Sequence, residues 1–250
     1  MTRPRRSVSY RIAQLAGWLM LLSMLGVLAY GAFRKGPSCV TFSDALIGVR
    51  VFEAPPCMQL DDDVVLYEAH IDTELGRIDA VLDPSISTAS VNTFVFLART
   101  GWYDGSVFHR VERTDDHAYA QGGAANPDGT GHAGFLVDER LPSPILTYRI
   151  GLLAMVATDD DLHDPVTQVS SQFFIIGDEW EAIAASSGSL PRYPLLGSVS
   201  DVRSLGVLRQ IIQLGSEEGT PSRQVRILSV TIDEIRDETS ASPSPSPTAT

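Results

Sequence analysis

The chain has 250 residues, of which 44% are hydrophobic, 8% aromatic and 20% charged, and its formal net charge is −12. This composition is globular, and it excludes a chain that is disordered throughout, a collagen-like repeat and a disulfide-rich miniprotein. The charge is uneven, because residues 1–35 carry six basic and no acidic side chains, and removing this +6 leaves −18 on the remainder. An acidic body repels phosphate backbones, so we expect no nucleic-acid partner.

The first predicted element is an uncharged apolar helix at residues 12–33, between Arg11 and Arg34. A helix of these 22 residues spans roughly 30 Å, the thickness of the hydrocarbon core of a bilayer. Four arginines precede it and two cations follow, which predicts a single-pass transmembrane helix with a basic tail, residues 1–11, in the cytoplasm. The alternative is a secreted protein whose signal peptide is cleaved near residues 29–31, although signal cores are usually only ~7–15 residues long. Both interpretations place the body outside the cytoplasm.

An extracytoplasmic spacer, residues 34–65, and a tail, residues 237–250, flank the predicted domain. The spacer holds both cysteines, Cys39 and Cys57, for which we predict a stabilising disulfide, with two free thiols as the alternative. Residues 240–250 are only Ser, Pro, Ala and Thr, so this tail lacks material for a core and is predicted to be disordered.

The remaining residues, 66–236, are predicted to form one mainly β domain. Alternation indicates a hairpin over residues 64–82, and residues 87–99 have the periodicity of a helix that Ser87 or Thr88 can cap. A second helix is expected at residues 202–214, and five further apolar runs indicate strands at 107–111, 150–157, 173–176, 195–199 and 225–232. Short strands with two helices predict a β-barrel or sandwich capped by helices, and the absence of strand–helix alternation excludes a doubly wound sheet.

Several motifs that could bind a cofactor or metal lack the context that they need. Residues 129–134 match G-x-G-x-x-G, but no strand leads into them and no long helix follows before Pro142, so we expect a glycine-rich loop. The histidines lack the spacing of a zinc site, and the aspartates at 159–164 lack a calcium-loop pattern. We therefore expect no metal and no cofactor.

A series of short segments in fixed order carries the functional signal. They are Asp104–Val111 (DGSVFHRV), Gln121–Gly123 (QGG), Gly129–Gly131 (GTG), Leu153–Met155 (LAM), Ser171–Ile175 (SQFFI) and Leu195–Val199 (LLGSV). From about Ile71 to Glu234 the chain resembles the cyclophilin family of peptidyl-prolyl cis/trans isomerases. The resemblance implies a closed antiparallel β-barrel capped by two helices, acting on proline-containing polypeptides. We expect a monomer that assists the folding of exported polypeptides.

The chemistry of this family requires no covalent step. Rotation about the bond before proline has a barrier of about 18–20 kcal/mol, because the C–N bond has partial double-bond character. An enzyme must bind the twisted amide, whose nitrogen gains a lone pair, better than either planar form. Arg110 matches the catalytic arginine of the family, and Gln121 matches the glutamine that bonds the substrate and orients the arginine.

The resemblance assigns further residues to the substrate. Phe108, Met155, Phe174 and Leu196 match positions that line the proline pocket, with ordinary core packing as the alternative. Val156 and Ala157 lie where the family offers backbone groups to the peptide, Gln172 belongs to the Ser-Gln-Phe-Phe-Ile motif, and Tyr193 presents a polar tip.

The chain departs from the family between Arg110 and Gln121. These residues are eleven positions apart rather than the usual eight, and Ala118 replaces a phenylalanine that forms one pocket wall. Tyr119 is a candidate substitute if its side chain turns inward. The departure motivates an alternative function, a non-catalytic peptide-binding or chaperone module at the membrane surface.

Overall fold

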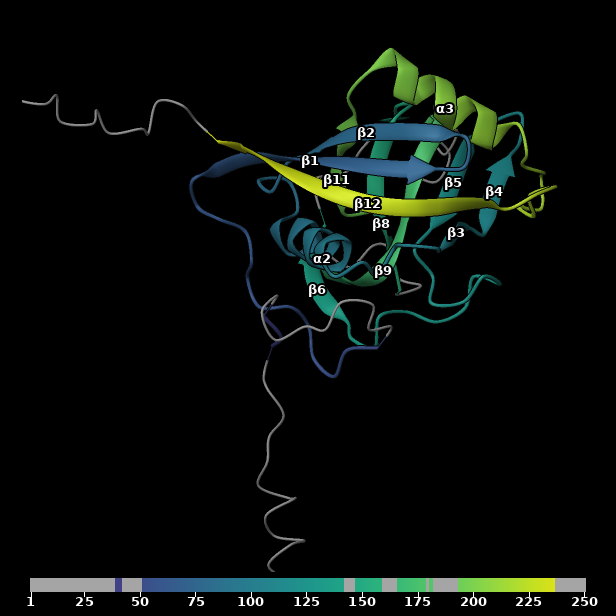
Figure 1. Ribbon diagram of the computed structural model, residues 1–250. Coiled ribbons are helices and arrows are strands. Elements are labelled where there is room, and N and C mark those ends of the chain that lie inside the picture. The colour runs from purple at the N-terminus through teal and green to yellow at the C-terminus, as the bar shows by residue number, and fades with distance from the viewer. Residues whose placement is uncertain are drawn as a thin grey trace, which may run out of the picture. The chain divides into compact units, whose positions relative to one another are not determined.

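The computed structural model describes residues 39–41, 51–141, 147–158, 166–178, 180–181 and 193–236, and the structural statements below concern these residues (Figure 1). The predicted cytoplasmic tail, transmembrane helix and C-terminal tail lie outside them, as does the acidic loop at 159–164. Within the described residues, no helix has the length and hydropathy needed to span a bilayer.

An antiparallel sheet forms most of the structure. Its strands are β1 (Val64–Thr73), β2 (Gly76–Leu82), β3 (Val107–Phe108), β4 (Arg110–Arg113), β5 (Ala118–Gly122), β6 (Val137–Arg140), β8 (Leu152–Ala157), β9 (Val166–Asp178), β11 (Leu195–Val199) and β12 (Val225–Arg236). Neighbours follow the order β3-β12-β1-β2-β11-β8-β9-β5-β4, with β6 paired to β9. The two end strands, β3 and β4, are separated only by His109, so the sheet forms a nearly closed barrel. The predicted mainly β barrel with two helices is confirmed.

Two helices cover different sides of the barrel. Helix α2 (Thr88–Arg99) packs against β6, β9 and β12, whereas α3 (Val202–Ile212) packs against β2, β4 and β5 (Figure 1). The side chain of Asp201 caps α3 by accepting hydrogen bonds from the backbone N–H groups of Arg203 and Ser204, at 2.7 and 3.1 Å. A short separate pair of strands, β7 (Thr147–Tyr148) and β10 (Trp180–Glu181), completes the described secondary structure.

The cap of α2 differs from the prediction. Ser87 occupies the N-cap position, but its side chain makes no capping bond, and the hydroxyl of Thr88 instead donates to the carbonyl of Pro84. The buried carboxylate of Glu139, on β6, accepts a 2.7 Å bond from the backbone N–H of Ser90. An anion is favoured at a helix N-terminus, so Glu139, from a distant strand, caps α2 in place of the Ser87 or Thr88 side chain that the local sequence predicted.

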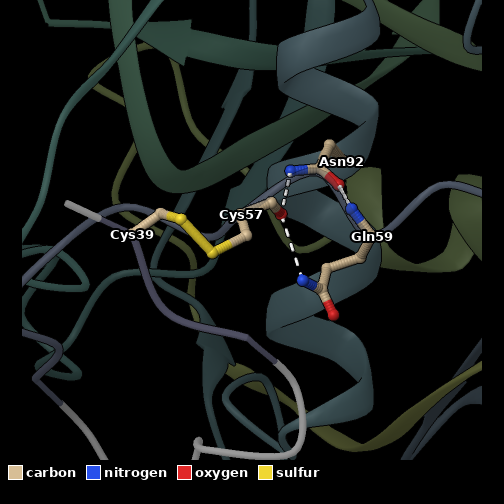
Figure 2. The surroundings of a disulfide bond; sticks show 4 residues. All are labelled: Cys39, Cys57, Gln59 and Asn92. Carbon is tan, nitrogen blue, oxygen red and sulfur yellow. Dashed lines mark hydrogen bonds between the residues drawn. A yellow bond between two sulfur atoms is a disulfide. The ribbon is translucent and has the colours of Figure 1, made fainter. Parts of the chain in front are cut away.

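The predicted cysteine pair, Cys39 and Cys57, is joined by a disulfide in the structure (Figure 2). Asn92, on α2, donates a 3.1 Å bond to the carbonyl of Cys57 and accepts a 2.7 Å bond from the backbone N–H of Gln59. The residues next to the disulfide are therefore attached to a helix of the domain.

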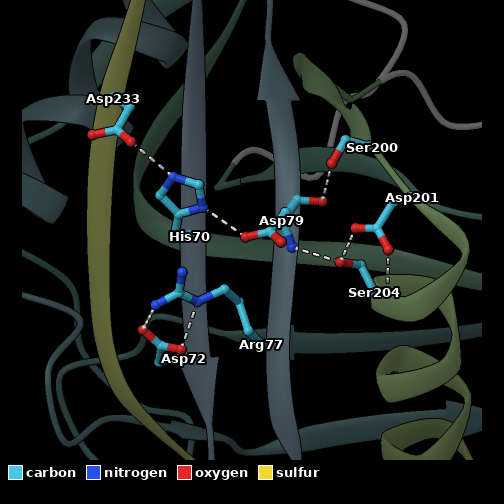
Figure 3. Close-up of polar contacts among 8 residues, drawn as sticks. All are labelled: His70, Asp72, Arg77, Asp79, Ser200, Asp201, Ser204 and Asp233. Atoms are coloured by element: carbon cyan, nitrogen blue, oxygen red, sulfur yellow. Dashed lines mark hydrogen bonds and ion pairs between the residues drawn. The ribbon is translucent and has the colours of Figure 1, made fainter.

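Polar side chains join three adjacent strands on one face of the sheet (Figure 3). The ring of His70, on β1, contacts Asp79 on β2 at 2.6 Å and Asp233 on β12 at 3.1 Å. The backbone N–H of Asp79 donates to the hydroxyl of Ser204, which donates in turn to the helix cap Asp201. This network connects the middle of the sheet to the first turn of α3.

Candidate active site

The β4–β5 hairpin places Arg110 directly opposite Gln121. Beyond this pair, Val111 pairs with Ala120, Glu112 with Tyr119 and Arg113 with Ala118, so three further pairs lie towards the turn. Alternation sends Val111 and Ala120, the second pair, into the core and leaves the polar side chains of the first and third pairs on the opposite face.

The long spacing between Arg110 and Gln121 is absorbed by this hairpin. Its turn is closed by Thr114, whose backbone N–H donates to the carbonyl of His117 at 2.9 Å. The hydroxyl of Thr114 also accepts bonds from the backbone N–H groups of Asp116 and His117, at 3.2 and 3.1 Å. The additional residues lengthen the hairpin at its tip and leave the arginine and the glutamine in register.

A small, largely apolar cavity of about 60 Å³ opens beside the hairpin. It is lined by Tyr119, Gln121, Val156, Phe174 and Tyr193. The ring of Phe174 packs edge-on against the rings of Tyr193 and Tyr119, with centroids 4.9 and 5.8 Å apart. The cavity thus brings together four residues that the sequence predicted to bind substrate, Gln121, Val156, Phe174 and Tyr193. They come from three strands and the segment before β11, and Tyr119 forms the remaining wall.

Tyr119 occupies the wall that Ala118 cannot form. The side chain of Ala118 is buried in the core, so the next residue along β5 faces the cavity. The sequence alone could not show which face of the sheet Tyr119 projects from, because this depends on where the turn ends. The structure therefore replaces the missing aromatic wall with a neighbouring aromatic side chain.

Three residues expected to line the cavity lie behind it instead. Phe108, Met155 and Leu196 have no exposed surface and belong to the hydrophobic core. Phe108 packs against Phe173 at a centroid distance of 6.1 Å, on the core side of β9. The expectation of pocket contact is corrected for these three residues, because strand alternation turns Met155 inward where Val156 faces the cavity. Ala157 is half-buried at the end of β8 and does not line the cavity.

Two glutamines form a chain of hydrogen bonds beside the cavity. The amide of Gln121 donates to the side-chain oxygen of Gln172 at 2.8 Å. The amide of Gln172 donates in turn to the carbonyls of Gly129 and Gly131, each at 3.2 Å. Both glycines have positive φ, which L side chains rarely adopt. The glycine-rich loop thus orients the amide of Gln121 through Gln172, a role that its sequence pattern did not reveal.

The guanidinium of Arg110 is held by the hairpin itself. Its Nε donates to the hydroxyl of Tyr119 at 2.8 Å, and its Nη2 donates to the carboxylate of Glu112. The hydroxyl of Tyr119 donates to the same carboxylate oxygen at 2.9 Å, and Nε2 of His117 lies 2.8 Å from the other. Arg110 is 44% exposed and Glu112 only 13% exposed, so the arginine reaches solvent while its anchor is shielded.

These contacts fix the charge state of the site. Burial raises the pKa of the Glu112 carboxyl, but the bonds from His117, Arg110 and Tyr119 outweigh burial and lower it. Burial also disfavours the charge of Arg110, and the bonds to Tyr119 and Glu112 overcome it and raise its pKa. Burial raises the pKa of Tyr119 to about 12. At neutral pH the site therefore holds a cation, an anion and a neutral phenol.

The nearly closed barrel, with an aromatic cavity beside an arginine and a glutamine, defines a cyclophilin-like protein. The sequence profile of the family described as "Cyclophilin type peptidyl-prolyl cis-trans isomerase/CLD" matches residues 68–232. The chain therefore belongs to the cyclophilin-type peptidyl-prolyl cis-trans isomerase family.

Similar proteins include two named "Probable peptidyl-prolyl cis-trans isomerase B". The one from Mycobacterium tuberculosis is 27% identical over 201 residues, covering 74% of this chain and 60% of that protein. The one from Mycobacterium leprae is 25% identical over 214 residues, covering 79% and 68%. The chain thus spans about 60% of the length of the M. tuberculosis protein. A crystal structure of a Cryptosporidium parvum cyclophilin type peptidyl-prolyl cis-trans isomerase aligns with 67% of this chain and 98% of its own, at 23% identity and a TM-score of 0.51, which supports the fold.

Proposed function

We propose that this chain is a peptidyl-prolyl cis/trans isomerase in which Arg110 stabilises the twisted amide before proline. One observation carries the proposal: an apolar cavity lined by aromatic rings opens beside a guanidinium that the hairpin holds in place. The cavity binds the proline ring by burying its apolar surface. The arginine then acts on the bond that precedes the ring.

The contribution of Arg110 is electrostatic. As the amide twists, its nitrogen loses resonance with the carbonyl and gains a lone pair that accepts a hydrogen bond. A guanidinium has five N–H donors, and the described contacts of Arg110 engage Nε and Nη2, which leaves Nη1 to the substrate. Because the guanidinium is already held in position, it does not have to reorganise as the lone pair develops on the amide nitrogen.

The remaining cavity residues bind and orient the peptide. Gln121 presents an amide that Gln172 and the glycine-rich loop hold in place. Tyr193 is anchored through its backbone N–H, which donates to the hydroxyl of Tyr148 at 3.0 Å. The half-buried end of β8, at Val156 and Ala157, offers backbone groups along the path of an extended peptide.

Relaxation of an X-Pro peptide from cis to trans tests this proposal. We expect the full chain in detergent micelles to accelerate the relaxation, and Arg110→Ala to reduce kcat/KM by about 100-fold, because loss of ~2–3 kcal/mol of selective stabilisation has that effect. Equal rates for the two proteins would remove Arg110 from the mechanism. Peptide binding by the wild-type chain without acceleration would favour the non-catalytic binding module.

We propose further that the domain acts on exported polypeptides outside the cytoplasm, anchored by residues 12–33 as a monomer. The uncharged segment with its asymmetric basic flanks supports the orientation. The disulfide between Cys39 and Cys57 supports an oxidising compartment, because such bonds are rare in the cytosol.

Mass spectrometry of the chain isolated from membranes of a bacterial host tests the location. We expect the N-terminal peptide to be intact and the peptides of Cys39 and Cys57 to be joined. A soluble protein cleaved near residue 31 would establish secretion instead of anchoring. Two free thiols in freshly alkylated material would contradict export.

A further inference from the structure

We propose that Glu112 is a positioning residue that fixes the guanidinium of Arg110 beside the cavity, an inference that rests on the proposed function. Glu112 does not line the cavity itself, and it acts through the arginine. The chemistry that it serves is the stabilisation of the prolyl amide by Nη1 of Arg110.

The register of the hairpin makes this contact. Glu112 lies two residues after Arg110 on β4, so both side chains project from the same face. The residue opposite Glu112 is Tyr119, which is also a wall of the cavity. Arg110, Glu112 and Tyr119 therefore form a closed triangle of hydrogen bonds, in which each residue bonds the other two.

Glu112 is itself held rigidly. Its second oxygen lies 2.8 Å from Nε2 of His117, and Nδ1 of His117 lies 3.2 Å from the hydroxyl of Thr114 in the turn. The ring of His117 stacks on the ring of Tyr119, with an interplanar angle of 8°. A carboxylate fixed by three partners and largely shielded from solvent is a firm anchor for a long, flexible arginine.

The triangle fixes the direction in which Arg110 points. Nε is tied to the cavity wall and Nη2 to Glu112, so rotation about the terminal bonds of the arginine is restricted. Without Glu112, the 44% exposed side chain would sample several rotamers, most of which direct Nη1 away from the substrate. The residues that lengthen the hairpin thus supply the support for its arginine.

A double-mutant cycle tests the dependence of Glu112 on Arg110. We expect Glu112→Ala to lower kcat/KM by about tenfold, mainly through kcat, because a charge-assisted bond that orients the reacting donor is lost. Glu112→Gln keeps an acceptor oxygen for Arg110, so it should recover activity to within about threefold of the wild type. In an Arg110→Ala background, Glu112→Ala should change nothing further.

The control is Asp72→Ala, which removes an ion pair with Arg77 on the β1–β2 hairpin, away from the cavity. We expect it to leave kcat/KM unchanged. Unchanged or increased activity of Glu112→Ala would overturn the proposal. So would an equal loss from Glu112→Ala in the presence and absence of Arg110.

A second measurement does not depend on turnover. The Nε–Hε signal of Arg110, identified by its disappearance in Arg110→Lys, should be sharp and protected from exchange in ¹⁵N NMR spectra of the wild-type chain. Glu112→Ala should broaden it, and Glu112→Gln should largely restore it. An equally sharp signal in Glu112→Ala would overturn the positioning role. If the signal is sharp in the wild type and lost in Glu112→Ala, but the wild-type chain has no isomerase activity, only the proposed function would be overturned.

Discussion

At the scale of the residue, Tyr119 carries two roles that can be separated. Its ring forms a cavity wall against Phe174, and its hydroxyl bonds both Arg110 and Glu112. In the proposed mechanism the ring contributes to the affinity for proline, since it buries apolar surface. The hydroxyl contributes there to the orientation of the arginine and so to the rate.

Substitutions at Tyr119 should therefore change different kinetic constants. We expect Tyr119→Phe to lower kcat about five- to tenfold with little change in KM, because the wall remains while the hydrogen bonds of the hydroxyl to Arg110 and Glu112 are lost. Tyr119→Ala should raise KM about tenfold as well. Steady-state kinetics on a proline peptide measure both, and a purely KM effect of Tyr119→Phe would contradict the assignment of the hydroxyl.

Sequence reasoning could predict the parts of the site that follow short local motifs. Gln121, Phe174 and Gln172 lie within such motifs, and the structure places all three at or beside the cavity. Tyr119 was identified only as a candidate, and Glu112 was not identified at all. Both depend on which residues face each other across a hairpin, and that pairing is set by the length of its turn.

At the scale of the element, His70 connects three strands through its two ring nitrogens. Hydrogen bonding to Asp79, aided by Asp233, raises the pKa of His70 above its ordinary value although burial opposes this. The protonated ring donates to one carboxylate on each side, so the charged form favours the folded sheet (Figure 3).

The stability of the domain should therefore depend on pH through His70. A pKa raised on folding stabilises the protein fully below the unfolded value of about 6.5, and the stabilisation is lost as the pH rises through the folded value. We expect His70→Gln to lower the free energy of unfolding more at about pH 5.5 than at about pH 9, measured by denaturant titration. His132→Gln, at an exposed position, is the control, and a pH-independent cost at His70 would contradict the linkage.

Predicted elements were most accurate where local patterning was strong. The first hairpin, both helices and the strands near 152–157 and 195–199 were expected from alternation or helical period. Strands β5 and β6 were not predicted as separate elements, because β5 alternates alanine with polar side chains and β6 follows a glycine-rich loop. The capping of α2 by Glu139 could not be predicted either, since Glu139 lies 49 positions after Ser90, from whose backbone N–H it accepts a hydrogen bond.

At the scale of the whole molecule, residues 36–250 carry a net negative charge, whereas the proposed mechanism depends on one cation, Arg110. Arg110 is paired with Glu112, so the hairpin neutralises part of its charge while it fixes its direction. The hairpin therefore supplies a fixed position for the guanidinium rather than a large net charge. Selective binding of a twisted amide requires such a fixed donor.

The central claim is that the cavity and Arg110 together catalyse rotation about the bond before proline. NMR exchange spectroscopy of an X-Pro peptide at equilibrium, with a small amount of the full chain, reports binding and rotation in one sample. We predict cis–trans exchange peaks with the wild-type chain and their loss with Arg110→Ala, while both proteins shift the peptide resonances on binding. Exchange of equal rate with both proteins, or bound peptide without exchange in the wild type, would contradict the claim.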